Sequence, residues 1–189
     1  MIGAIILAAG CSRRFGDDKR KARLMNGKMV IEQTLDNVLQ HFEDIILTLR
    51  NDDHQFHNTL VEKYKDNAFT IFQAPNSALG IGNSLASAVK QIDDWDGVFI
   101  FLADMPYIKS GTLKSLTKAL RNENIVLPLH EGQRGHPVGF GRRFFGQLSA
   151  LKGDAGAKEV LLKNADEILE VSVPDHGVLK DIDRPADIA

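Results

Sequence analysis

The chain has 189 residues, of which 43% are hydrophobic and 25% are charged, and these values are typical of one soluble globular domain. We therefore expect a single domain over residues 1–189. The formal net charge of -2 gives no overall basic field for nucleic acid, so an anionic ligand must be bound locally. The apolar start at Met1 to Gly10 is too short for a signal peptide, and the single cysteine excludes an internal disulfide. These features predict a cytoplasmic protein without a membrane partner.

Short apolar runs alternate with amphipathic stretches along the chain. Strands are predicted at Ala4–Leu7, Ile45–Leu49, Phe69–Phe72, Val98–Leu102 and Ile125–Leu129, and helices at Val30–Gln40, Asp53–Lys65, Ser84–Gln91 and Ser110–Arg121. This alternation predicts an α/β fold with a doubly wound, mostly parallel sheet and helices on both faces. Ligands of such sheets bind beyond the carboxyl ends of the strands.

The loop after the first strand has the composition of a polyphosphate site. Its small residues let backbone N–H groups approach an anion, and its cations can neutralise charge on the phosphates. The small residues are Ala8, Ala9, Gly10 and Ser12, and the cations are Arg14 and Lys19. The spacing matches neither a P-loop nor a dinucleotide-binding fingerprint. Taken alone, the loop could equally be an ordinary turn with a basic, solvated rim.

Carboxylates occur at two further places where a metal ion could be held. Asp104 follows the strand Val98–Leu102 directly, and Pro106 stiffens the exit, which favours a Mg²⁺ ligand over a turn or helix-capping aspartate. Asp181 and Asp183 share one side of an extended segment because they are two residues apart. One of these two aspartates could complete a two-carboxylate Mg²⁺ site with Asp104.

Two other loops contain candidate ligand contacts. Gly80 and Gly82 free backbone amides that could cradle an anion or close over a base, and Ser84 can cap the following helix, although a flexible loop with a capped helix explains the segment as well. His136 lies at the edge of a predicted turn between two strands. It could contact an anionic or heteroaromatic substrate, or be an ordinary loop histidine.

Two other candidates are interpreted as structural. Cys11 lies in the phosphate loop but has no histidine or carboxylate partner at a persuasive position, so a small side chain explains it better than a nucleophile. His54 and His57 match no zinc spacing and are predicted to lie on a solvated helix.

These segments, taken together and in order, closely resemble the MobA-like nucleotidyltransferases, and within them the molybdenum cofactor cytidylyltransferases. The resemblance covers essentially the whole chain. It is carried by Leu7–Gly10, Ser12–Gly16, Lys19, Gly80–Leu85, Ala103–Pro106, Gly135–Val138, Gly153–Lys158 and Asp181–Pro185. The first three of these segments belong to one loop, so the chain matches six elements in the same order, and these together are far more specific than any one of them.

The resemblance implies a Rossmann-like, Mg²⁺-dependent enzyme that joins a nucleoside monophosphate to a phosphorylated acceptor and releases pyrophosphate. Arg14 and Lys19 match the charge-stabilising cations, Asp104 matches the metal-binding aspartate, and Asp183 lies in the element that supplies the second ligand. Residues 80–84 correspond to the part that reads the base. His136 and residues 153–158 fall on the acceptor side.

The resemblance also bears on the substrates. The guanylyl branch has Ala-Gly-Gly where this chain has Ala8-Ala9-Gly10, and a Gly-Pro-Leu-type segment where this chain has residues 80–85, so CTP is the expected nucleotide. The expected acceptor is molybdopterin carrying molybdenum, and the expected partner is a molybdoenzyme of the xanthine dehydrogenase type. One departure is Lys21, where the family usually has an apolar residue. It leaves Lys19 or Lys21 as the phosphate ligand, and the spacing from Gly16 favours Lys19.

Three other functions are considered. A cytidylyltransferase acting on a sugar or polyol phosphate has a related fold, but residues 135–138 and 181–185 argue against it. A non-catalytic accessory that carries a nucleotide or cofactor would have no need of Arg14, Lys19, Asp104 and Asp183. A NAD-binding protein would require a third glycine in the first loop.

Overall fold

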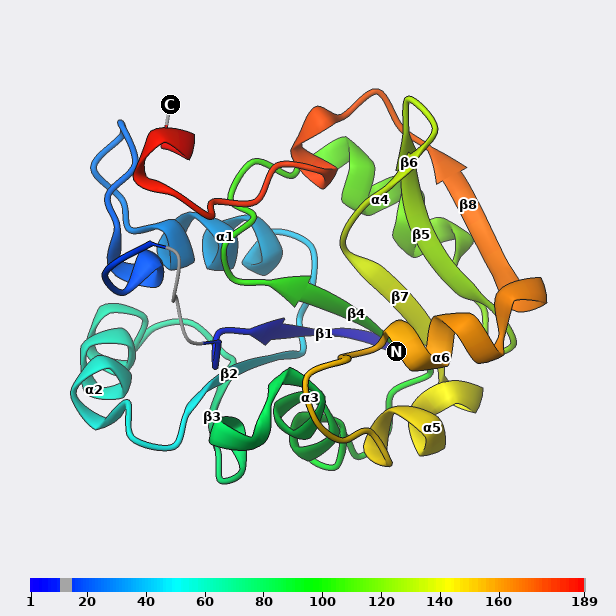
Figure 1. The fold of residues 1–189 in the computed structure, drawn as a ribbon, viewed down its shortest axis with the longest axis horizontal. Helices are drawn as coiled ribbons and strands as arrows, with labels where there is room; N and C mark the ends of the chain where they lie inside the picture. Colours follow the sequence, from blue (N-terminus) through cyan, green and yellow to red (C-terminus); the bar gives the residue numbers. More distant parts are fainter. Residues whose placement is uncertain (11–14, 189) are drawn as a thin grey trace.

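A mixed β-sheet forms the centre of the molecule, with helices packed on both faces (Figure 1). The structure is a computed structural model, and it describes residues 1–10 and 15–188. The strands are β1 (Ile2–Leu7), β2 (Ile45–Arg50), β3 (Thr70–Ala74), β4 (Gly97–Leu102), β5 (Ile125–His130), β6 (Gln133–Arg134), β7 (Val138–Gly141) and β8 (Ile168–Ser172). The α-helices are α1 (Val30–Leu39), α2 (His54–Lys63), α3 (Ile81–Val89), α4 (Ser110–Ala119), α5 (Phe145–Ser149) and α6 (Lys158–Lys163).

The strand order is β3-β2-β1-β4-β7-β5-β6, and β8 pairs with β5. β1 is parallel to β2 and β4, β2 is parallel to β3, and β5 is parallel to β8. β7 runs antiparallel between β4 and β5, so β4 and β5 point the same way. The predicted α/β fold with a mostly parallel, doubly wound sheet is confirmed. The sequence indicates a turn between two strands around His136 but gives no bounds for the short strands β6 and β7, and β8 was not predicted.

The central strands are buried on both faces, which explains their continuous apolar sequences. One core layer joins the sheet to α1, α2 and α4, through residues such as Leu35, Phe56 and Leu116. The second layer joins it to α3, α5 and α6, through Leu85 and Leu148 among others. Helices α1 and α2, which connect β1 to β2 and β2 to β3, thus lie on one face, and α3, which returns the chain to β4 on the other side of β1, lies on the opposite face, as right-handed crossovers require.

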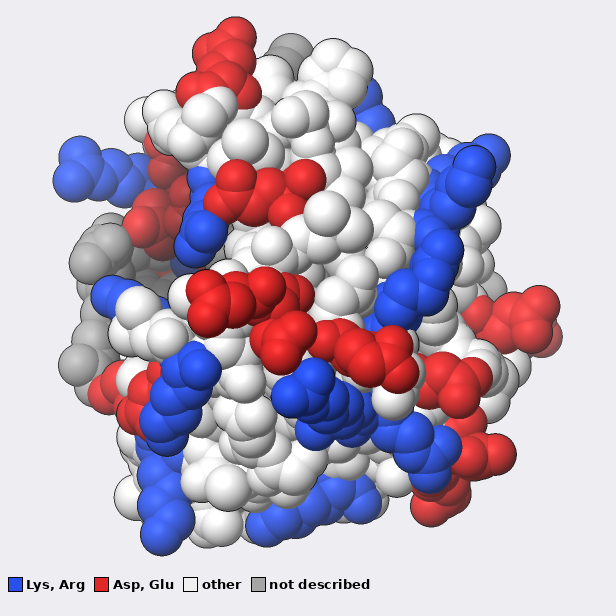
Figure 2. Space-filling view, turned by 90° about the vertical axis from the view of Figure 1, so that its right-hand side faces the viewer, with Lys and Arg blue, Asp and Glu red and all other residues white. Residues whose placement is uncertain are grey.

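The side of the molecule that carries β8 and α6 has acidic and basic side chains interspersed over its surface (Figure 2). Arg134 pairs with Glu170 at 2.6 Å, and Arg143 pairs with Glu167 at 3.3 Å. The visible part of this face therefore has no extended region of purely positive or purely negative charge. Within residues 1–10 and 15–188, every helix is too short or too polar to cross a lipid bilayer.

Candidate active site

The carboxyl ends of β1 and β4 meet at one edge of the sheet. Leu7 is the register partner of Leu102, and the N–H of Ala103 donates to the carbonyl of Leu7 at 3.1 Å. Ala8 and Asp104 follow these strands, so the small-residue loop and the predicted metal ligand lie next to each other. This is the edge where a doubly wound sheet binds ligands.

Three carboxylates converge at this edge. Asp104, Asp181 and Asp183 each offer an oxygen atom, and these oxygen atoms lie within 4.8 Å of one another. Oδ1 of Asp104 is buried and has no hydrogen-bond partner within the described parts of the chain. Burial, together with Asp183 and Asp104, raises the pKa of Asp181 above its ordinary value. An all-oxygen cluster with an unpartnered buried oxygen fits a hard divalent cation such as Mg²⁺. The structure brings both candidate second ligands to Asp104.

The C-terminal segment reaches the site through Ile182. Its side chain is fully buried in a small cluster with Leu24 and Val30, against which Tyr107 packs. Its N–H donates to the carbonyl of Asp104 at 2.9 Å. Because successive side chains of an extended segment point in opposite directions, burying Ile182 turns the residues on either side of it away from this cluster. This explains why Asp181 and Asp183 face the same site.

Lys19 begins a short 3-10 helix (Lys19–Lys21) and extends into the carboxylate cluster. Its Nζ lies 3.0 Å from Oδ1 of Asp183 and forms an ion pair with Oδ2 of Asp104. Burial lowers the pKa of Lys19, but the two carboxylates outweigh this and hold the pKa above its ordinary value. Lys21 instead points to the Phe56 ring and lies 3.9 Å from Asp18. The structure therefore places Lys19, rather than Lys21, at the carboxylates.

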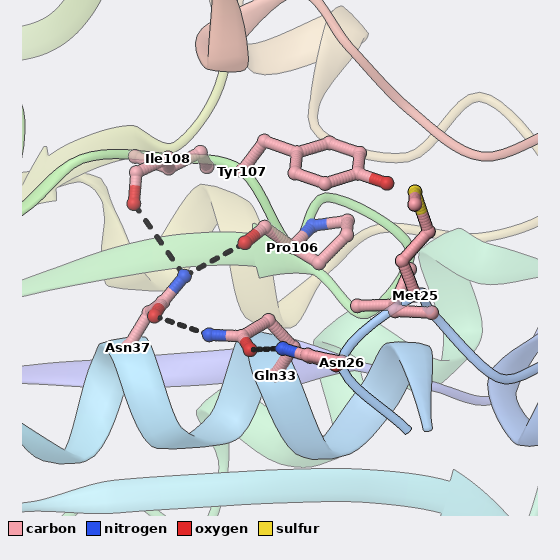
Figure 3. A pocket seen from close by; sticks show the side chains of 8 residues that line it. Met25, Asn26, Gln33, Asn37, Pro106, Tyr107 and Ile108 are labelled. Atoms are coloured by element: carbon pink, nitrogen blue, oxygen red, sulfur yellow. Dashed lines mark hydrogen bonds between the residues drawn. The ribbon is translucent and has the colours of Figure 1, made fainter. Parts of the chain in front are cut away.

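Helix α1 holds the backbone on both sides of Asp104. The hydroxyl of Thr34 donates to the carbonyl of Ala103 at 3.0 Å, and the amide of Asn37 donates to the carbonyl of Pro106 at 2.8 Å. Asn37 in turn accepts from Gln33, and these two side chains, together with Pro106, line a cavity of about 330 Å³ (Figure 3). These α1 residues could not be predicted from the sequence, because a polar position on a helix gives no sign of the backbone that it contacts.

His136 lies beside the carboxylates, in the short segment that connects β6 to β7, both of which run antiparallel to β5. Burial lowers the pKa of His136, against the opposing attraction of Asp104 and Asp181. The backbone there is fixed, because the N–H of His136 donates to the carbonyl of Val178 at 2.9 Å, and a Cβ on Gly135 would lie 2.4 Å from that carbonyl oxygen. A turn between two strands is present, as predicted, but it lies at Glu131 and Gly132, between β5 and β6, so His136 follows the turn by four residues.

The glycine loop before α3 packs against the loop at Gly153. The N–H of Gly82 donates to the carbonyl of Gly153 at 2.8 Å, and a Cβ on Gly80 would lie 2.5 Å from the same carbonyl oxygen. The Gly82 amide is therefore engaged within the protein. The prediction that Ser84 caps α3 is wrong: the helix begins three residues earlier, at Ile81, and the Ser84 hydroxyl donates back to the carbonyl of Gly80 at 3.4 Å.

Several predicted residues lie outside the described part of the chain. These are Cys11, Ser12 and Arg14. Of the remaining loop residues, Gly10 is exposed and open, since a Cβ there would meet no atom within 4 Å. His54 and His57 lie on the first turn of α2, as predicted, and His54 contacts Gln73 at 3.3 Å. Among the described residues, only the three aspartates form a group able to hold a metal ion.

Comparison with known proteins confirms the family resemblance. The model of the MobA-like NTP transferase domain matches residues 4–168. The chain is 30% identical to the purine catabolism protein PucB of Bacillus subtilis, over 96% of this chain and 91% of that protein. It is 29% identical to the molybdenum cofactor cytidylyltransferase of Escherichia coli, over 92% of each.

The fold also agrees with solved structures. The structure of Rv0371c from Mycobacterium tuberculosis superposes with a TM-score of 0.81 and 24% identity, over 99% of this chain and 95% of that one. A nucleotidyl transferase from Methanothermobacter has the same TM-score of 0.81 at 19% identity, over 99% and 94% of the two chains. Both likenesses extend over nearly the whole of this chain, in agreement with the α/β architecture described above.

Proposed function

The chain belongs to the MobA-like NTP transferase family, and from this premise we propose that it is a cytidylyltransferase of the molybdenum cofactor. In this proposal CMP passes from CTP to the terminal phosphate of molybdopterin, with Mg²⁺ as the cation. The observation that carries the proposal is the cluster of Asp104, Asp181, Asp183 and Lys19 beside the small-residue end of β1. The relative named as a molybdenum cofactor cytidylyltransferase supports the choice of nucleotide and acceptor.

The reaction needs no covalent chemistry from the protein. An oxygen of the acceptor phosphate forms a bond to the α-phosphorus of CTP. The bond from that phosphorus to the oxygen that bridges to the β-phosphate breaks, and its electron pair leaves with pyrophosphate. Such in-line transfer requires positioning and charge stabilisation, and this agrees with a site built from carboxylates and a lysine. A bound Mg²⁺ would neutralise charge on the phosphates.

The residues of the site have separate roles in this proposal. Asp104 and Asp183 hold the cation, with Asp181 as a further oxygen ligand in the same cluster. Lys19 stabilises the charge that develops on the phosphates, and the backbone of residues 8–10 contacts the triphosphate. Arg14 is the second proposed cation. His136 borders the acceptor, and residues 80–84 approach the base.

The relatives also suggest where the product is used. One relative is named for purine catabolism and another for cytidylyl transfer to the molybdenum cofactor. Both names fit a product that is delivered to a molybdoenzyme of the xanthine dehydrogenase type, which we propose as the partner.

Pyrophosphate release tests the proposal. The purified protein is incubated with Mg²⁺ and each of the four NTPs, with and without molybdopterin. We expect release only with acceptor present, best with CTP, and none after the metal is chelated. Release with a polyol phosphate in place of molybdopterin would assign the chain to the other cytidylyltransferases. Binding of CTP without any release would instead identify a carrier.

A further inference from the structure

Arg20 is a buried charge that contacts the phosphate loop near both of its ends, at Ala8 and at Asp18. Its side chain is 3% exposed, although arginines are rarely buried unless they are paired. All five guanidinium N–H groups have acceptors. Nε and Nη2 donate to the two oxygens of Asp18 at 2.7 and 2.6 Å, Nη1 and Nη2 donate to the two oxygens of Asp53 at 2.5 and 2.9 Å, and Nη1 also donates to the carbonyl of Ala8 at 2.7 Å.

This arrangement joins three segments that are distant in sequence. Ala8 directly follows β1, Asp18 directly precedes Lys19, and Asp53 lies between β2 and α2. Arg50 reinforces the connection from the other side, because it lies 3.0 Å from Asp53 and 3.2 Å from Asp18. Although burial opposes it, hydrogen bonds from Arg20 and Arg50 lower the pKa of Asp53 to about 2, so this carboxylate stays charged at neutral pH. The fork of an arginine suits two bidentate carboxylates, whereas a lysine has neither the planar geometry nor enough donors.

The bond to Ala8 determines how the next peptide is oriented. The N–H of Ala8 donates to the carbonyl of Thr48 on β2 at 2.9 Å, and its carbonyl accepts from Arg20, which is joined to Asp53 just beyond β2. The peptide between Ala8 and Ala9 is trans, so the N–H of Ala9 points away from Arg20, on the side of β1 that faces β4. Among the described residues, that N–H has no acceptor. It is a donor presented to the site.

The bonds to Asp18 determine where Lys19 lies. The Asp18 side chain caps the short 3-10 helix by accepting from the N–H of Arg20 at 3.2 Å, and its carbonyl accepts from the N–H of Lys21 at 2.9 Å. Within this turn the Arg20 side chain points into the interior, where it meets Asp53, whereas the Lys19 side chain points to Asp104 and Asp183. One guanidinium therefore restrains both the Ala9 amide and the Lys19 side chain.

We propose that Arg20 is a positioning residue for the triphosphate of the nucleotide: it orients the Ala9 N–H and the Lys19 ammonium so that both meet the phosphates. This inference rests on the proposed nucleotidyl transfer. It predicts that Arg20 governs affinity for pyrophosphate and CTP without touching either, because a misdirected donor loses its hydrogen bond to an anionic ligand.

The test measures the binding of Mg²⁺-pyrophosphate and Mg²⁺-CTP by calorimetry, at a temperature where every variant is folded. We expect Arg20→Lys and Arg20→Met to raise both Kd values about tenfold or more, the loss of roughly one charge-assisted hydrogen bond. In turnover they should raise KM for CTP and lower kcat, while KM for molybdopterin stays unchanged. Arg20→Lys keeps the charge, so it provides the answer should Arg20→Met fail to fold.

Glu32→Gln is the matched control. Glu32 is a buried carboxylate paired with Lys63 at 2.6 Å, and its bond to the N–H of Met29 can be kept by glutamine. This variant should lose stability and keep both Kd values. Folded Arg20 variants with lowered melting temperatures and unchanged Kd values would show that Arg20 only stabilises the fold, and would overturn the positioning role. A wild-type protein that binds neither ligand would overturn the proposed function itself, and the positioning role with it.

Discussion

Replacing Lys19 by alanine removes the ammonium that lies among the carboxylates. The Lys19 side chain is 19% exposed, and its Nζ is shared between Asp183, at 3.0 Å, and Asp104. A preorganised donor in such a site contributes most when charge develops in the transition state, and its loss lowers kcat by about 10²- to 10³-fold, or roughly 3 to 4 kcal/mol. Lys21 provides the matched comparison. Its side chain is 52% exposed and its nearest carboxylate oxygen is 3.9 Å away, so Lys21→Ala should cost less than about fivefold.

The same substitution should have the opposite effect on metal binding. The Lys19 ammonium bonds to Asp104 and Asp183, two of the three aspartates that would hold a divalent cation. Without it, the carboxylates lose their nearest positive charge, and a divalent ion gains from that change. We therefore expect Lys19→Ala to bind Mn²⁺ more tightly than the parent when no nucleotide is present, whereas Lys21→Ala should bind it as the parent does.

Two assays separate these effects. Pyrophosphate release at saturating CTP and acceptor gives kcat, and titration with Mn²⁺, followed by electron paramagnetic resonance, gives the affinity for metal. A larger loss of kcat in Lys21→Ala would mean that the phosphate loop is misassigned by two residues. Unchanged Mn²⁺ affinity in Lys19→Ala would show that the lysine and the cation do not share the carboxylates.

The remaining predictions concern the metal ligands, the base and acid stability. Asp104→Ala should lower kcat by about 10²-fold or more with the fold intact, and Asp183→Ala should lower kcat less because Asp181 lies in the same cluster. Circular dichroism is the control for folding, and near-normal turnover of Asp104→Ala would exclude Asp104 as a metal ligand. GTP should be used about 10²-fold less well than CTP in kcat/KM, and Ala9→Gly should narrow that gap; equal use of GTP would refute the choice of base. The folded-state pKa of Asp53 is lowered from 3.8 to about 2, so its stabilisation is complete above 3.8 and is lost as the pH falls toward 2. Asp53→Asn should accordingly lower the free energy of unfolding by about 2 kcal/mol at neutral pH, and urea titrations should show this difference shrinking over that acidic range.

The sequence predicts much of the sheet because its central strands are apolar throughout and its helices are amphipathic. β7 escaped prediction since it contributes only four residues, two of them glycines, and its burial comes from the neighbouring strands β4 and β5. β8 lies at an edge of the sheet and is half exposed, so its apolar pattern is weak. Such strands are determined by their neighbours rather than by their own composition.

Some residues of the candidate site could likewise be predicted from the sequence, and others could not. Asp104 could be predicted because it follows a buried strand at the edge of the sheet where ligands bind. Asp181 and Asp183 could be predicted because residues two apart in an extended segment point to the same side. Arg20 could not, because a basic residue between two lysines is usually solvated, and its burial depends on Asp53, which is 33 residues away in sequence. Likewise, the contact between Gly82 and Gly153 joins two loops whose separate sequences indicate only flexibility.

The reversed direction of β7 has a consequence for how this enzyme family can diversify. Val138 pairs with Ile100, so β7 begins near the carboxyl end of β4, and the segment between β6 and β7 brings His136 to the aspartates without any crossover helix. A short connecting segment can be lengthened or exchanged at little thermodynamic cost, whereas a parallel strand cannot be moved without rebuilding its crossover connection. Under the proposed function, acceptor preference can therefore change in this segment while the parallel strands that carry the proposed nucleotide site stay as they are.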